Sequence, residues 1–195
     1  EMALLGRQSR AQKPKRHELL DIPIGSMIEL SDAITFETSE TGARTFEVTE
    51  RKKYESSGLL RYMYLLEDEG EEVVLGVDRI GNTNTYEISR LIIDSEDELG
   101  EDLPDSITLN YPHPDDEEQE IALKYVRQEI VLAKMTLVNL VEWVEYDIEL
   151  HEYNNADQGL MSVEICGNWL TFYVGGLISL SDVSIFPAEE EEEYV

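Results

Sequence analysis

A strict two-residue alternation in the C-terminal third is the feature that most limits the folds open to this chain. From 144 to 150 the even positions are apolar, and the odd positions are Glu145, Asp147 and Glu149. Successive side chains of a strand point to opposite faces, so this period gives one buried and one solvated face. We therefore predict a strand here with three carboxylates in a row on its wet side.

The segments that follow predict the partners of this strand. The turn-forming sequence NNADQG at 154–159 leads to an apolar run at 161–165. The sequence CGN at 166–168 then turns the chain into WLTFYV at 169–174. We predict a three-stranded antiparallel meander, with a closing strand at 183–186.

Val, Ile, Tyr and Thr also alternate with polar residues in short runs along the rest of the chain, and twelve glycines and six prolines punctuate it. The runs predicted as strands are 22–30, 33–37, 45–50, 59–66, 73–78 and 86–94. The acidic turn EDEGEE at 67–72 indicates a hairpin between two of them. The predicted fold class is mostly β, with antiparallel sheets and meanders in one or two small barrel-like or sandwich-like halves and at most one or two short helices.

The stretch 117–144 fits two patterns. Ile121, Leu123 and Tyr125 alternate as in a strand, and we predict a strand at 121–127. Further on, apolar residues recur at the three-and-four spacing of a helix, namely Leu137, Leu140, Val141 and Val144. We expect the one helix of the chain within 130–144, and a strand in its place would make the fold all β.

Charge and β pattern together divide the chain into four parts. We predict a flexible basic arm at 1–17, a β-rich half at 18–95, a second β-rich half with the meander at 96–187, and a disordered acidic tail at 188–195. The basic residues of the arm are Arg7, Arg10, Lys13, Lys15 and Arg16. About half of the acidic residues gather in clusters expected in solvated loops and the tail, at 67–72, 94–102, 115–120 and 189–193.

The overall charge excludes one large class of function. Fifteen Lys and Arg face 43 Asp and Glu, which gives a formal net charge of -28, so we expect no nucleic-acid binding. The lone Cys166 cannot form an intrachain disulfide, and no apolar segment follows the basic start. We therefore expect a cytoplasmic protein.

No common catalytic signature occurs in the chain. It contains no glycine-rich phosphate loop, no G-x-S-x-G and no H-E-x-x-H. A nucleophilic pair of Cys166 and His151 is conceivable, but Cys166 has no positive neighbour in sequence, so an ordinary thiol is the better interpretation. The acidic run at 94–102 departs from the EF-hand spacing. We predict a non-enzyme with no catalytic, cofactor-binding or metal-binding residues.

These observations favour a non-catalytic module that binds a protein partner. Its predicted interaction surface comprises the carboxylates of the alternating strand and the basic residues of the arm, and only the arm would allow contact with a membrane. Two alternatives stay open. One is an acidic inhibitor or nucleic-acid mimic that binds a basic protein, and the other is a divalent-metal-dependent enzyme.

The order of these patterns resembles one bacterial family. The run EWVEY at 142–146, the loop NNADQG and the ending VEICGNWLTFYVGGLISLSDVSIF at 163–186 are similar to the closing meander of the YjfK-like family, whose function is unknown. The basic leader and the strand LLRYMYLL at 59–66 resemble its first half. The resemblance implies a cytoplasmic accessory protein linked to envelope stress, and it transfers no functional residue.

Overall fold

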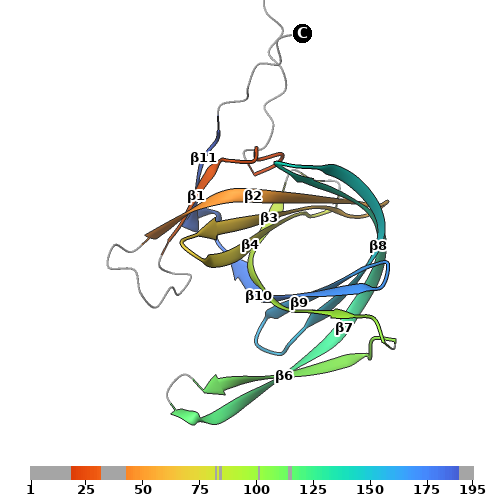
Figure 1. The fold of residues 1–195 in the computed structure, drawn as a ribbon. Helices are drawn as coiled ribbons and strands as arrows, with labels where there is room; N and C mark the ends of the chain where they lie inside the picture. The colour runs from red at the N-terminus through yellow and green to blue at the C-terminus, as the bar shows by residue number, and fades with distance from the viewer. Residues whose placement is uncertain are drawn as a thin grey trace, which may run out of the picture.

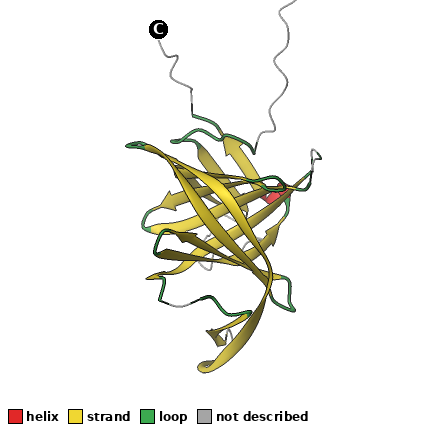
Figure 2. Ribbon diagram, turned by 90° about the vertical axis from the view of Figure 1, so that its right-hand side faces the viewer, coloured by secondary structure: helices red, strands yellow, loops and turns green. Residues whose placement is uncertain are grey.

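The structure, a computed structural model, describes residues 19–31, 43–81, 83, 85–100, 102–113 and 116–188. Across these ranges the regular elements are strands and one 3-10 turn, with no α-helix (Figure 2). The elements are β1 (Met27–Ser31), β2 (Ala43–Glu55), β3 (Leu60–Asp68), β4 (Glu71–Arg79), β5 (Tyr86–Glu98), β6 (Ser106–His113), β7 (Asp116–Asn139), β8 (Trp143–Asn154), β9 (Gly159–Cys166), β10 (Trp169–Ile178), η2 (Leu180–Asp182) and β11 (Val183–Phe186). The predicted mostly-β, antiparallel fold class is confirmed.

The strands form one antiparallel sheet that closes into a ring. Its order is β2-β3-β4-β5-β10-β9-β8-β7, and β7 returns to pair with β2 from Glu50↔Asn139 to Glu55↔Lys134. Figure 1 shows this ring from one end, with the β6–β7 hairpin extending below it. Within the ring, strands from the two predicted halves are joined at two seams, β5–β10 and β2–β7, so both halves contribute to the same ring, and β1 also pairs with β11 outside it.

The predicted hairpin and meander are both present. Glu69 and Gly70 connect β3 to β4 with φ of 45° and 90°, which is the conformation of a two-residue type I′ turn. Glycine adopts this left-handed conformation without strain. β8, β9 and β10 pair in sequence as expected from the alternation of apolar and polar residues.

Two apolar clusters lie outside the ring and a third lies within it. The first outer cluster packs the outward side chains of β3 and β4, such as Tyr64 and Leu75, beneath β1 and the segment 19–26. The second packs β6 and the first part of β7 against β8–β10, around Tyr125 and Tyr153. The interior cluster draws side chains from all the ring strands. Burial on both faces explains why a single sheet can form a stable domain.

A bulge in β2 moves this strand from one cluster to another. The register with β3 shifts between Val48 and Glu50. Before the bulge, Phe46 and Val48 pack in the first outer cluster, and after it Tyr54 points into the ring. An extra residue in one strand bends it and increases its twist, which lets the sheet curve and close.

The predicted helix within 130–144 is wrong. Residues 130–139 belong to β7, and Leu140 and Val141 form the exposed turn before β8. β7 pairs with β8 along one edge and with β2 along part of the other, while Val131, Ala133 and Met135 pack inside the ring. These long-range pairings stabilise the strand more than the helix-like spacing of apolar residues stabilises a helix, because a helix here would have no apolar surface to pack against.

The acidic clusters lie less in loops than the sequence analysis predicts. Residues 94–98 continue β5, and residues 95–98 pair with Phe172 to Trp169 of β10. Residues 67–68 and 71–72 likewise lie at the paired ends of β3 and β4. Strand pairing uses backbone groups, so acidic side chains that stay exposed can extend a strand beyond its apolar core.

Several predicted segments lie outside the described residues. These are the basic arm at 1–17, the strand at 33–37 and the acidic tail from 189 onward. Among the helical elements that the structure does describe, none is long and apolar enough to span a lipid bilayer.

Candidate functional site

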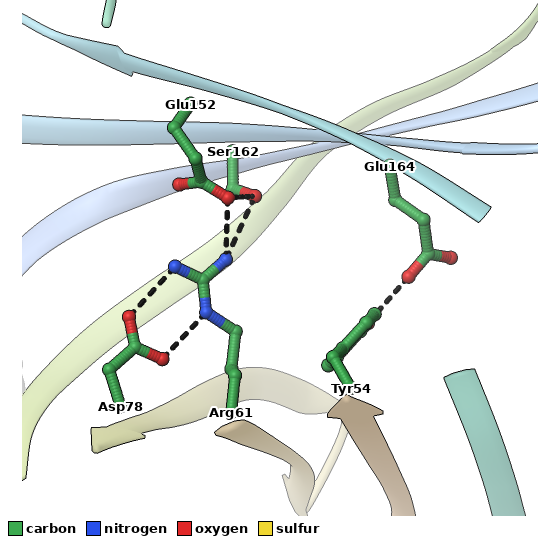
Figure 3. Close-up of polar contacts among 6 residues, drawn as sticks. All are labelled: Tyr54, Arg61, Asp78, Glu152, Ser162 and Glu164. Atoms are coloured by element: carbon green, nitrogen blue, oxygen red, sulfur yellow. Dashed lines mark hydrogen bonds and ion pairs between the residues drawn. The ribbon is translucent and has the colours of Figure 1, made fainter. Parts of the chain in front are cut away.

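A buried arginine joins strands on opposite sides of the ring. Arg61 of β3 donates from Nε and Nη2 to the two carboxylate oxygens of Asp78, at 2.6 and 2.8 Å. Its Nη1 reaches across the interior to Glu152 Oε1 at 2.6 Å and Ser162 Oγ at 3.3 Å (Figure 3). Burial alone would lower the pKa of Arg61, but attraction to Asp78 and Glu152 outweighs it, and the pKa is raised well above its ordinary value. Arg61 therefore stays charged in the interior.

A second polar group lies deeper in the ring, around Glu164 of β9. Lys52 Nζ donates to Glu164 Oε1 at 3.0 Å and to the hydroxyl oxygen of Tyr173 at 2.9 Å, and the hydroxyl of Tyr54 donates to Glu164 Oε2. Figure 3 shows Tyr54 and Arg61 rising from neighbouring strands toward partners on the far wall. Burial would lower the pKa of Lys52, but Tyr173 and Glu164 raise it above its usual range. Both oxygens of the buried carboxylate are satisfied.

Ionisation of buried tyrosines is expected to unfold the protein in alkali. Burial is the largest cause that raises the pKa of Tyr54, Tyr62, Tyr64 and Tyr173, the last to about 12. A tyrosine whose pKa is higher in the folded state than in the unfolded state stabilises the fold fully below the unfolded pKa of about 10. This stabilisation is lost as the pH rises above that value. We expect the free energy of unfolding to fall by about 1.4 kcal/mol per pH unit for each such tyrosine above pH 10.

Urea denaturation at pH 8, 10 and 11, followed by tyrosinate absorbance, checks this expectation. Tyr54→Phe is the control and should reduce the slope of stability against pH. Ionisation of all ten tyrosines near pH 10 without loss of the folded state would contradict it.

Cys166 and His151 do not form a nucleophilic pair. Cys166 packs with the interior cluster, whereas His151 faces outward, bonded through Nε2 to Glu149 and 3.3 Å through Nδ1 from Arg127 Nη1. Burial, followed by repulsion from Glu164, raises the pKa of the Cys166 thiol. The thiol is therefore protonated at neutral pH and a weak nucleophile.

One edge of β7 lacks a partner strand over six residues. β8 lines one edge of β7, and β6 and β2 share the other. β6 pairing ends at Val126, followed by the bond from Arg127 N to Asp105 O, and β2 pairing begins at Lys134. Among the strands that the structure describes, none pairs with 128–133 on this side. A window of roughly 20 Å of strand edge therefore stays open in the wall of the ring.

A groove follows this open edge, and we call it the β7 groove. It has a volume of about 1080 Å³ and is lined by residues 55–59 of the β2–β3 turn, residues 129–134 of β7 and residues 147–149 of β8, with Ile165 and Gly167. Ile130 and Leu132 are 48% and 71% exposed. Its charged residues are four carboxylates and one amine, namely Glu55, Glu129, Asp147, Glu149 and Lys134. The groove thus combines unpaired backbone, apolar side chains and negative charge.

Two residues of the predicted acidic row, Asp147 and Glu149, line this groove. Glu145, Asp147 and Glu149 stand on the outer face of β8, opposite Thr136, Lys134 and Leu132 of β7. Two of the three carboxylates have partners: Lys134 Nζ is 3.4 Å from Asp147 Oδ1, and Glu149 is bonded to His151. The basic residues of the arm, which form the other part of the predicted surface, lie outside the described residues.

The interior charges are the residues that sequence reasoning missed. Arg61 and Lys52 look like ordinary surface cations, because their segments, LLRYMYLL and ERKKYE, show no signal of partners more than 90 residues away. For Arg61, the available sign of burial was a cation within an otherwise apolar strand, whereas the charged segment around Lys52 offered no such sign. Within the described residues, no three His, Cys, Asp or Glu side chains converge as metal ligands would.

No protein-family model, curated protein or solved structure matches this chain. The resemblance to the YjfK-like family and its link to envelope stress therefore stay predictions.

Proposed function

We propose that this protein is a non-catalytic binding protein that takes up an extended, basic segment of a partner protein along the open edge of β7. The observation that carries the proposal is the unpaired edge at 128–133, which lies beside an acidic groove. An added strand would gain main-chain hydrogen bonds from this edge, and alternate side chains would contact the groove.

The chemistry of the groove selects the occupant. Exposed Ile130 and Leu132 offer apolar contact to one set of side chains in the added strand. Four carboxylates against one lysine favour lysine or arginine in the other set. The net charge of -28 would also attract a basic segment from a distance and speed its association.

A peptide-binding measurement tests this proposal. A six-residue peptide of alternating lysine and valine should bind, as seen by calorimetry and by amide shifts at 128–133, whereas an alternating glutamate–valine peptide should not. Methylation of the backbone amides of the lysine–valine peptide should abolish binding, because it blocks strand pairing. Unchanged affinity after methylation would refute strand addition and favour an acidic inhibitor that recognises charge alone.

Two variants of the protein sharpen the test. Leu132→Lys should weaken the peptide at least tenfold, since it removes apolar contact and adds a repelling charge to the edge. Lys134→Met should strengthen it, because it removes the one cation of the groove. Both side chains are more than 70% exposed, so melting temperatures should stay unchanged.

A further inference from the structure

The interior of the ring is filled at one level and hollow at another. Around Glu164 it is packed by large side chains, including Tyr54, Tyr173, Met135 and Leu150. Toward the end where β3 begins and β4 ends, small residues line the wall instead, namely Gly76, Ser89 and Ser162. The cavity left there has a volume of about 490 Å³, which is within the range of small-molecule sites.

Gly76 is one of the small residues that leave the cavity open. A Cβ at Gly76 would lie 2.3 Å from Ser89 Oγ, so the serine hydroxyl on the neighbouring strand occupies space that a larger residue at 76 would take. Gly76 itself is buried. The wall therefore presents hydroxyl groups and a bare backbone where a filled interior would need branched apolar side chains.

The cavity has an excess of negative charge. Its charged lining residues are Arg61, Asp78, Glu87, Glu129 and Glu152. Arg61 is already engaged by Asp78 and Glu152. Glu87 and Glu129 stand at the exposed rim, and no ion pair to either occurs among the described residues. A cation entering the cavity would meet two carboxylates that pair with no cation in the part of the chain that the structure describes.

The other lining residues indicate which chemical class of cation the cavity would bind. Four apolar side chains, Met63, Leu91, Leu160 and Leu177, offer contact to hydrocarbon. Three side-chain amides of the lining, those of Gln128, Asn154 and Gln158, can accept hydrogen bonds from ammonium groups, whereas the Asn155 Oδ1 already accepts from the backbone N–H groups of Asp157 and Gly159. Since the described residues hold no cluster of three metal-ligating side chains, the lining suits an organic cation rather than a metal ion.

We propose that this cavity binds a small aliphatic diamine, with its methylene chain against the apolar residues and its ammonium groups at the carboxylates of Glu87 and Glu129. This site differs from the β7 groove, although Glu129 borders both. The ring would then carry a small-molecule site at its mouth in addition to the peptide site in its wall.

Calorimetry with 1,5-diaminopentane tests the proposal. The diamine should bind at about 100 mM salt with saturation at one site, and amide signals of Ser89 and Ser162 should shift. The neutral analogue 1,5-pentanediol should not bind. Absence of diamine binding at millimolar concentration, or equal binding of the diol, would overturn the proposal.

Two double variants, each of which removes two negative charges, distinguish binding at this cavity from general attraction of the diamine to an acidic protein. Glu87→Gln with Glu129→Gln should weaken the diamine about tenfold, whereas Glu145→Gln with Asp147→Asn should change its affinity less than twofold. Equal effects of the two pairs would show non-specific attraction and refute the site.

A size variant provides a readout that does not depend on charge. Leu177 is 53% exposed at the mouth of the cavity, so Leu177→Trp should fold normally and obstruct entry. We expect it to weaken the diamine at least fivefold and to leave binding of the lysine–valine peptide unchanged. Unaltered diamine affinity in this variant would place the diamine elsewhere.

Discussion

Replacement of Arg61 with methionine is expected to lower the free energy of unfolding by about 3–5 kcal/mol. Asp78 and Glu152 would then lie in the ring with no cation between them, and Ser162 would lose one of its bonds. A carboxylate that is largely withdrawn from water and has lost its partner retains much of the cost of leaving water. Urea denaturation followed by tryptophan fluorescence measures the loss.

Two comparisons identify the cause of the Arg61 effect. Lys134→Met removes an exposed cation that also pairs with a carboxylate, and it should change stability by less than about 1 kcal/mol. Arg61→Met combined with Asp78→Asn and Glu152→Gln should be more stable than Arg61→Met alone, since the uncompensated charges are gone. A loss below about 1 kcal/mol for Arg61→Met would show that the interior is well hydrated.

Gly175→Ala is expected to have the second large effect, a loss of about 3 kcal/mol. An added Cβ would lie 2.0 Å from the carbonyl oxygen of Arg90 and 2.9 Å from Leu91 Cα. These are backbone atoms of β5, so relief requires β10 to move away from its partner strand. Because β5–β10 is one of the two seams that join the ring, we expect a lower melting temperature and less cooperative unfolding.

The adjacent glycine is a matched control. Gly176→Ala adds the same methyl group one residue further along β10, where no atom lies within 4 Å of the new Cβ. We expect its stability to change by no more than about 1 kcal/mol, with a small gain if the unfolded chain loses entropy. Equal melting temperatures for the two variants would contradict the close approach of β5 and β10 at Gly175.

Local patterns were sufficient to predict one hairpin and one meander of the sheet. The meander β8–β10 follows from alternation around Ile148 and from the turns at 154–159 and 166–168. The β3–β4 hairpin follows from two apolar runs on either side of an acidic turn with Gly70. These features depend on residues close in sequence, so they can be read from a short window.

The same local reasoning failed where distant pairing decides the conformation. The spacing of Leu137, Leu140 and Val141 favours a helix, but pairing with β2 and β8 holds residue 137 in a strand. Local patterns predicted the acidic row around Glu145 but not the open edge of β7 near it. That edge exists only because pairing with β6 ends before pairing with β2 begins.

By itself, the sequence determined the antiparallel β character, the hairpin and meander, and the excess of negative charge, since each depends on residue type and short-range period. Only the tertiary structure decided that the sheet closes, that Arg61 and Lys52 are buried against carboxylates, and that a cavity and an open strand edge remain. The physical reason is that closure joins strands β2 and β7, which lie far apart in the chain. Whether a charged side chain faces water or the interior depends on that closure.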